Sequence, residues 1–140
     1  MTDTIDFDEL NRNVIAEFRA NGGKVGGMLE GTPLVLVHNT GARTGTVRIT
    51  PLVRLQDDGR LFVFATKGGS PEHPAWYHNL VANPEVTVEL ETETYPALAQ
   101  VLDGAERDEI YARQAAARPE FAEYERKTSR TIPVIELVRR

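Results

Sequence analysis

Apolar and polar residues follow two different periodicities along this chain. Near the start, Phe7, Leu10, Val14, Ile15 and Phe18 recur at three- and four-residue steps. This spacing predicts an amphipathic helix that begins at residue 6 and ends at the turn-forming residues 21–23. Residues 24–31 hold three glycines and no period, so we expect a flexible connector, which leaves open whether the helix acts as a lid.

From Pro33 onward the rhythm becomes that of β-strands, with β-branched runs and strict alternation. The turns between successive runs are too short for parallel crossovers, which favours antiparallel hairpins. Pro96 places the beginning of the fifth strand at an edge or a bulge, because proline cannot donate to a ladder. The predicted strands cover residues 34–37, 47–55, 61–65, 85–90, 95–102 and 131–138.

Three further helical segments are predicted at residues 75–82, 104–117 and 119–127, the last two separated at Pro119. The expected fold class is therefore α+β. About six mostly antiparallel strands form a small closed or half-closed barrel, with an N-terminal helix and a helical pair before the last strand. A single domain over residues 1–140 fits the length, with residues 1–31 as the helix and its connector.

Composition removes several classes of function. The chain has 16 Lys and Arg against 21 Asp and Glu, a net charge of −5, so nucleic-acid binding is not expected. The lack of cysteine excludes disulfides and thiolate chemistry. His73 and His78 are five positions apart, a spacing that does not place them on one face of a helix, so no metal site is expected. No apolar run is long enough for a transmembrane segment and the start is acidic, which predicts a soluble, cytoplasmic protein.

The strongest local signal for chemistry lies in the turn at residues 40–48. Gly41 and Gly45 bracket Arg43 and Thr44, and Arg48 follows. Backbone amides of such a turn, together with two forked guanidinium groups, can hold an anion. The alternative is an ordinary hairpin turn with two solvated arginines.

Three more segments suit the wall of a flat, charged ligand. The third strand leads into Thr66, Lys67 and two glycines, and Trp76 follows a glycine-rich loop. Phe121 and Tyr124 share a helical face, where a phenol can donate a proton. Packing in the core explains the aromatic residues equally well. The sequence has no dinucleotide, P-loop or nucleophilic-serine motif.

Taken together, five segments in this order resemble the deazaflavin-dependent nitroreductase family over nearly the whole chain. That family has the split β-barrel fold of FMN-binding-like oxidoreductases and uses reduced coenzyme F420, an 8-hydroxy-5-deazaflavin. The segments that carry the resemblance are 34–45, 48–52, 65–69, 73–84 and 130–134.

By this resemblance, the chain transfers a hydride from C5 of reduced F420 to a small electrophilic acceptor of the quinone, enone or nitroaromatic type. Arg43, its turn and Arg48 would hold the phosphate and acidic tail of the coenzyme, and Lys67 would add charge. Tyr124 and Thr66 are the candidate catalytic residues. The implied coenzyme-binding residues are Ala42, Arg43, Thr44, Arg48, Pro51, Val53, Phe64, Ala65, Thr66, Lys67, Ala75, Trp76 and Asn79.

The sequence departs from the family at three positions. Relatives usually carry a basic residue where Ala42 stands, and tyrosines also occur at the positions of Phe121 and Lys127. Two other functions stay open: an FMN-binding split-barrel oxidoreductase and a non-catalytic carrier of the coenzyme. A quinone acceptor would bring peripheral contact with a membrane, and the chain would be a monomer or a homodimer.

Overall fold

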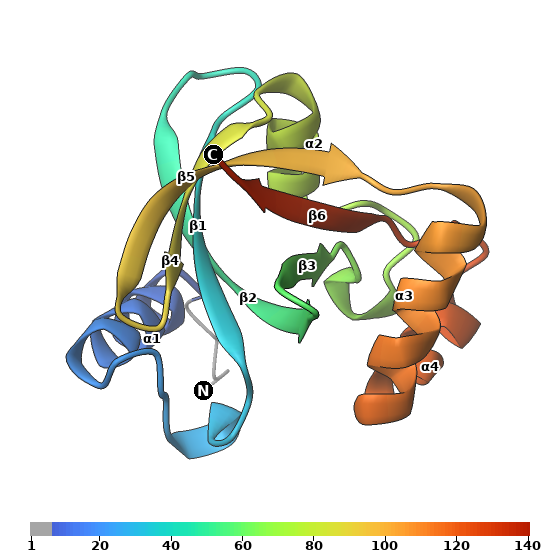
Figure 1. Ribbon diagram of the computed structural model, residues 1–140, viewed down its shortest axis with the longest axis horizontal. Coiled ribbons are helices and arrows are strands. Elements are labelled where there is room, and N and C mark those ends of the chain that lie inside the picture. The colour runs from blue at the N-terminus through green and yellow to red at the C-terminus, as the bar shows by residue number, and fades with distance from the viewer. Residues whose placement is uncertain (1–6) are drawn as a thin grey trace, which may run out of the picture.

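The computed structural model describes residues 7–140, in which six antiparallel strands close into a barrel (Figure 1). Neighbouring strands follow the order β1-β2-β3-β6-β5-β4 around it. The predicted fold class is confirmed. The strands are β1 (Leu34–Thr40), β2 (Val47–Asp57), β3 (Arg60–Phe64), β4 (Glu85–Leu90), β5 (Glu93–Val101) and β6 (Val134–Arg139).

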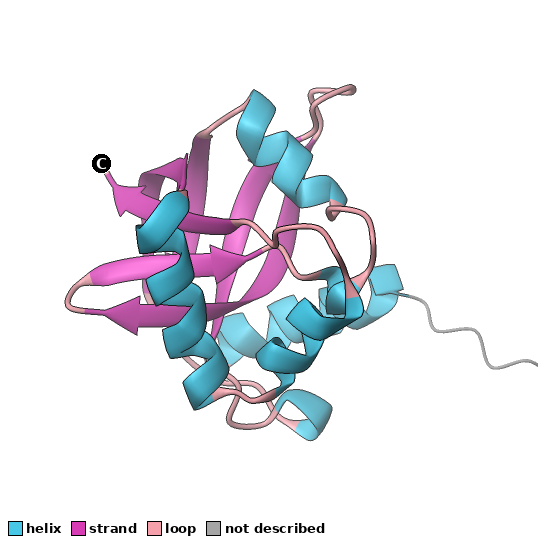
Figure 2. Cartoon of the chain, turned by 90° about the vertical axis from the view of Figure 1, so that its right-hand side faces the viewer, coloured by secondary structure: helices cyan, strands magenta, loops and turns pink. Residues whose placement is uncertain are grey.

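The helices lie around the outside of the barrel (Figure 2). In Figure 1, α1 (Phe7–Ala20) lies on the opposite side of the barrel from the pair formed by α3 (Gly104–Ala117) and α4 (Glu120–Lys127). The short α2 (Ala75–Ala82) lies beside the β1–β2 hairpin, and its bounds match the prediction. Two 3-10 turns, η1 (Gly27–Leu29) and η2 (Lys67–Gly69), complete the described elements.

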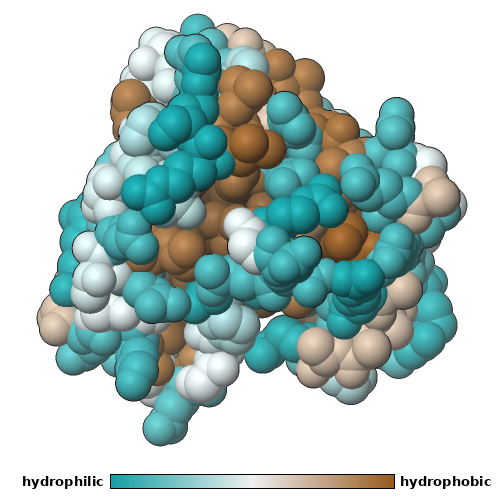
Figure 3. All heavy atoms as spheres, viewed as in Figure 1, coloured by the Kyte–Doolittle hydropathy of each residue, from teal (hydrophilic) through white to brown (hydrophobic). Residues whose placement is uncertain are grey.

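Three groups of buried side chains hold these layers together. Inward-facing residues such as Val35, Val63 and Ile135 fill the barrel. A second cluster, with Phe62 and Tyr111 at its centre, packs α3 and α4 against β3 and β6. Hydrophilic residues cover most of the surface seen in Figure 3, and apolar residues show mainly in recesses between them.

The third cluster packs α1 against the outside of β1. Val14 and Phe18 are buried against Leu34 and Leu36, which point outward from β1. The connector also folds back, because Val25 is buried in the same cluster. Alternate residues of β1 face the barrel and the helix, which explains why all of 34–37 is apolar. Residue 6, the predicted start of the helix, lies outside the described residues.

The barrel is split between β2 and β3, and this split prepares the site. Their pairing begins at Arg54↔Val63, whereas β2 pairs with β1 from Val47 onward. The amide of Arg54 donates to Pro33 O at 3.0 Å. Successive residues of a strand point their backbone N–H and C=O groups to opposite sides. The backbone groups of Ile49 and Pro51 therefore point away from β1, toward the side on which the register gives this part of β2 no neighbouring strand.

Two strands differ from the prediction in a way that the ladder explains. Strand β6 begins at Val134 because Pro133 precedes it, later than the predicted residue 131. Strand β5 begins at Glu93, before the predicted residue 95. Its pairing with β6 starts at Ala97↔Arg139, and Pro96 O accepts the Arg140 amide at 3.0 Å just beyond that ladder. Pro96 therefore lies at the end of the β5–β6 ladder, where its missing N–H costs no ladder hydrogen bond.

Candidate functional site

A cavity of about 760 Å³ lies between the β1–β2 hairpin and α2, and we call it the hairpin cavity. Its floor comes from inward-facing hairpin residues and its wall from one face of α2. The lining residues are Asn39, Gly41, Ala42, Arg43, Thr44, Arg48, Thr50, Ala75, Trp76, His78 and Asn79.

Two buried asparagines fix the turn at the mouth of the hairpin cavity. Asn79 donates from Nδ2 to Asn39 Oδ1 at 2.8 Å, and its Oδ1 accepts the Ala42 amide at 2.9 Å. Asn39 in turn donates to Thr50 Oγ1 at 3.0 Å. Since these amides are committed to the protein, Asn79 positions the turn, and the Ala42 amide is not free to bind an anion.

Arg43 and Arg48 stand out by their charge environment. Both line the hairpin cavity and are exposed, and neither guanidinium forms a hydrogen bond or ion pair with any described residue. Most other arginines of this acidic chain have a carboxylate partner, as Arg60 has in Glu136 at 2.8 Å. The lining of the hairpin cavity contains no Asp or Glu. Two cations without counter-ions therefore face a space that suits an anion.

A second cavity of about 410 Å³ lies at the split between β2 and β3, and we call it the split cavity. Trp76 lines both cavities, so they adjoin at this side chain, and we call the two together the groove. The other lining residues are Leu29, Thr32, Pro51, Leu52, Val53, Phe64, Thr66, Lys67, Arg118, Glu120, Phe121 and Tyr124.

An unusual loop brings Thr66 and Lys67 to the split cavity. Lys67, Gly68 and Gly69 have φ values of 45°, 63° and 84°, three left-handed residues in succession. A side chain at Gly69 would come within 2.9 Å of Lys127 Cβ and 3.0 Å of Tyr124 O. Glycine at position 69 is therefore what allows the loop to lie directly against α4.

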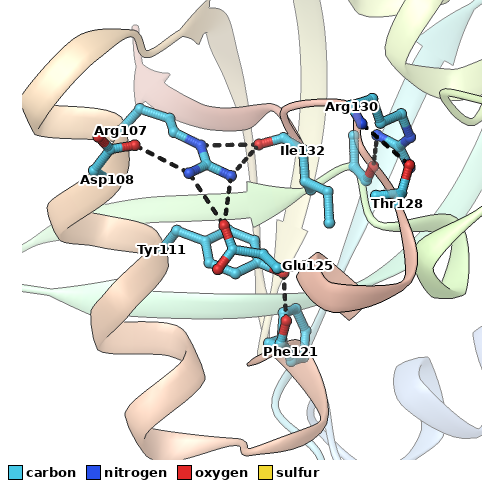
Figure 4. A network of polar contacts seen from close by, with 9 residues as sticks. Arg107, Asp108, Tyr111, Phe121, Glu125, Thr128, Arg130 and Ile132 are labelled. Carbon is cyan, nitrogen blue, oxygen red and sulfur yellow. Dashed lines mark hydrogen bonds and ion pairs between the residues drawn. The ribbon is translucent and has the colours of Figure 1, made fainter. Parts of the chain in front are cut away.

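Helix α4 carries Phe121 and Tyr124 into the split cavity, as their predicted common face implies. The two rings make an edge contact with centroids 5.3 Å apart. Tyr111 of α3 holds this helix, because its hydroxyl donates to Phe121 O at 2.6 Å (Figure 4). Burial raises the pKa of Tyr111 to about 12, so this phenol keeps its proton and its role as donor.

The structure gathers twelve of the thirteen predicted coenzyme-binding residues into this groove. Ala65 is the exception: its side chain is fully buried in the barrel core, and its backbone N and O bond Pro133 and Arg130. Lys67 lies in the split cavity, apart from Arg43 and Arg48, with its ammonium 3.7 Å from Glu72.

Sequence reasoning missed the residues that close the split cavity from the far side. Thr32 follows the first helix, and Arg118 and Glu120 flank the break between α3 and α4. Arg118 Nη2 donates to Thr32 Oγ1 at 3.4 Å and Arg118 Nε lies 3.2 Å from Glu120. No local motif marks these residues, since 86 positions separate Arg118 from Thr32.

A closed antiparallel barrel with a two-part groove at its split defines the class of split-barrel oxidoreductases. The model of the F420H(2)-dependent quinone reductase family matches residues 10–138. The chain belongs to this family, and it is an oxidoreductase that depends on coenzyme F420. The predicted membership of a deazaflavin-dependent reductase family is thereby confirmed.

Individual relatives agree with this assignment. An F420H(2)-dependent quinone reductase of Mycobacterium tuberculosis is 36% identical over 131 residues, which cover 89% of this chain and 87% of the relative. A solved F420-H2 dependent reductase shares 42% identity and a TM-score of 0.69 over 75% of this chain and 93% of its own. A solved structure described as a domain-swapped dimer shares 37% identity and a TM-score of 0.71 over 94% and 97%.

Proposed function

We propose that the groove binds F420 along its whole length and that the chain reduces a quinone-type acceptor in the split cavity. The observation that carries this proposal is that the two cavities adjoin at Trp76, with unpaired guanidinium groups in one and a phenol in the other. Arg43 and Arg48 would hold the phosphate and acidic tail. The edge of β2 at Pro51 would hold the deazaflavin.

The residues present fit such a coenzyme. The guanidinium groups of Arg43 and Arg48 have no protein partner among the described residues and are hydrogen-bond donors matched to phosphate and carboxylate. The unpaired carbonyl of Pro51, expected from the strand register, provides an acceptor at the edge of a flat ring system. Trp76 and Phe64 supply apolar faces on either side.

The bound coenzyme supplies the hydride, from C5 of its reduced form. The protein residues orient the reactants and manage charge. Reduction of a quinone leaves negative charge on an oxygen, and Tyr124 is placed to donate a hydrogen bond or a proton to it. Thr66 is the second candidate donor. Phe121 and Val53 keep water from this end of the groove.

Among the acceptor types, the lining favours a quinone. Leu29, Val53 and Phe121 form an apolar wall that suits a planar ring with an apolar substituent. The name of the mycobacterial relative, a quinone reductase, supports the same acceptor. Enones and nitroaromatic compounds are the competing acceptors.

A titration with oxidised F420, reduced F420, FMN and NADPH tests coenzyme choice. We expect F420 to bind at least about tenfold more tightly than FMN, because FMN lacks the acidic tail that Arg43 and Arg48 would hold. Equal or tighter binding of FMN would contradict the proposal. Turnover of reduced F420 with a quinone distinguishes the enzyme from a carrier, for which tight binding without turnover is the expected result.

Assembly and location are separate predictions. A dimer is supported by the relative described as a domain-swapped dimer, and the mass of the purified chain in solution decides between monomer and homodimer. No helix within residues 7–140 has the length and apolar character needed to cross a membrane. Action in the cytoplasm, with peripheral contact at a membrane that holds the quinone, stays a prediction.

A further inference from the structure

Arg130 makes several hydrogen bonds to the backbone of residues 65–70, the loop that borders the split cavity. It lies between α4 and β6. Its guanidinium donates to Ser70 O at 2.8 Å, to Ala65 O at 3.1 Å and to Thr66 O at 2.7 Å. The same group lies 2.9 Å from His73 Nδ1. Arg130 lines neither half of the groove, so these bonds serve the loop itself.

The segment that carries Arg130 is itself held in place. Arg107 of α3 donates twice to Ile132 O, at 3.0 and 2.9 Å, and the Arg130 amide donates to Thr128 Oγ1 at 3.3 Å (Figure 4). Ala65 N donates to Pro133 O at 3.0 Å. Arg130 therefore projects from a fixed segment onto the loop.

The loop needs such a restraint because its backbone is strained. Lys67 adopts φ of 45°, which is unfavourable for a residue with a side chain, and two left-handed glycines follow. Within the loop, Gly69 N donates to Thr66 O at 2.9 Å and Ser70 N donates to Lys67 O at 3.1 Å. Arg130 binds carbonyls on both sides of the strained residues, at Thr66 and at Ser70.

His73 completes this set of bonds in one protonation state. Arginine can only donate, so Nδ1 of His73 must accept and the proton of the neutral ring lies on Nε2. Protonation would place an N–H and a positive charge against the guanidinium. Burial, Arg130 and His78 all lower the pKa of His73 below its usual 6.5. The other charged or titratable groups facing His73 are Tyr77 and, around a small cavity, Asp103, Arg107 and Asp108.

We propose that Arg130 is a positioning residue of the reaction: with neutral His73 as an acceptor, it holds residues 65–70 in the conformation that presents Thr66 and Lys67 to the coenzyme. This inference rests on the proposed function, because the loop matters only if the split cavity binds F420. Through the contact of Gly69 with Tyr124 O, the same guanidinium sets the distance between the loop and α4.

The test begins with Arg130→Lys, which keeps the charge and loses the fork. We expect the Kd of oxidised F420 to rise about tenfold. In the coenzyme-free protein, hydrogen-exchange protection of the Gly69 and Ser70 amides should fall by a similar factor. Arg54→Lys is the matched control, because Arg54 Nε also donates to a backbone carbonyl, Leu34 O at 2.8 Å, away from this loop. Its Kd should stay within about twofold of wild type.

His73 variants test the second acceptor and keep the inference falsifiable if Arg130→Lys does not fold. His73→Asn retains an acceptor near the position of Nδ1 but cannot titrate, whereas His73→Ala removes it. As the pH falls below about 6.5, the wild-type loop should lose protection because His73 takes up a proton, and the loop of His73→Asn should not. Comparing Kd ratios at each pH cancels the ionisation of the coenzyme.

The outcomes separate this inference from the proposed function. Unchanged protection of Gly69 and Ser70 in both Arg130→Lys and His73→Ala would overturn the positioning role, whatever the coenzyme affinity. An equal rise of Kd in Arg54→Lys would overturn it as well, because general destabilisation would then explain the loss. Failure of the wild-type protein to bind F420 would contradict the proposed function, while the hydrogen-exchange result would still decide whether Arg130 and His73 hold the loop.

Discussion

At the scale of single residues, the groove separates side chains that hold the protein from side chains left for a ligand. Asn39 and Asn79 are buried and hydrogen-bonded to the hairpin, and Arg130 is committed to the loop. The side chains of Arg43, Arg48 and Tyr124 line the cavities and make no hydrogen bond or ion pair with a described residue. These side chains are therefore the candidates for binding and reaction, because the fold leaves their polar groups unused.

Replacing Arg43 with Ala should weaken F420 binding by about 1.5–3 kcal/mol, because a charge-assisted bond to phosphate is lost. Titration of the variant with oxidised F420 measures this change. Arg12→Ala is the control, since Arg12 is an exposed residue of α1 outside both cavities. An affinity that matches the control would mean that Arg43 is only a solvated turn residue.

Replacing Tyr124 with Phe keeps the edge contact between its ring and that of Phe121 and removes only the hydroxyl. If that hydroxyl assists the developing anion, kcat should fall about tenfold or more while the Kd of F420 stays near wild type. Tyr95→Phe, in the barrel interior, serves as the matched control. A raised KM with unchanged kcat would instead show that Tyr124 contributes to acceptor binding alone.

At the scale of elements, the site depends on how closely η2 approaches α4. Helix α4 is anchored by Phe121 in the second buried cluster, whereas the loop has a strained backbone. Their contact is possible because Gly69 has no side chain. This packing places Thr66 and Tyr124, which are 58 positions apart in sequence, in one cavity.

Two glycine variants separate backbone strain from this contact. A Cβ at position 68 would meet no atom within 4 Å. Gly68→Ala should therefore lower the free energy of unfolding by about 1 kcal/mol, through the positive φ alone. Gly69→Ala should cost more, because its Cβ would lie 2.9 Å from Lys127 Cβ. Thermal unfolding measures both. Gly69→Ala should also raise KM for the acceptor, and equal effects of the two variants would argue against the α4 contact.

At the scale of the whole molecule, one ionic cluster joins the N-terminal helix to the barrel. Arg19 of α1 donates to both oxygens of Glu89 on β4, at 2.9 and 2.7 Å, and His38 Nε2 lies 2.6 Å from Glu89. The hydrogen bonds from Arg19 and His38 lower the pKa of Glu89 to about 2. The cluster fastens the helix that the sequence left free to move.

The acid dependence of stability follows from the sign of this shift. The folded pKa of Glu89 lies below its ordinary value of 4.5, so its contribution is full above pH 4.5 and is lost as pH falls toward about 2. We expect this contribution to be about 1–2 kcal/mol, given the exposure of Arg19. Denaturant unfolding of wild type and Glu89→Gln across this range should converge at low pH.

A variant with a fully exposed carboxylate provides the comparison. Glu93 pairs with Arg139 at 2.9 Å, with both side chains 60% exposed, so Glu93→Gln should leave the pH dependence of unfolding unchanged. If the free energies of unfolding of wild type and Glu89→Gln changed in parallel with pH down to pH 2, the role of the cluster would be contradicted.

The sequence by itself determined the elements and the chemistry available to them. Local periodicity and turn residues predicted the bounds of α2, α3 and β4 because these depend on neighbours a few positions apart. The segments around Arg43, Lys67 and Trp76 were sufficient to predict the family and most of the groove. The sequence was thus sufficient to predict a split barrel that binds a coenzyme.

Only the tertiary structure decided which polar groups are free. The Asn39–Asn79 pair spans 40 positions, Arg130 reaches Thr66 across 64, and Arg19 reaches Glu89 across 70. No local pattern encodes such contacts, because they arise when the barrel closes and brings distant segments together. For the same reason, no local pattern showed that α1 packs on β1 or that the Ala65 side chain lies in the barrel core.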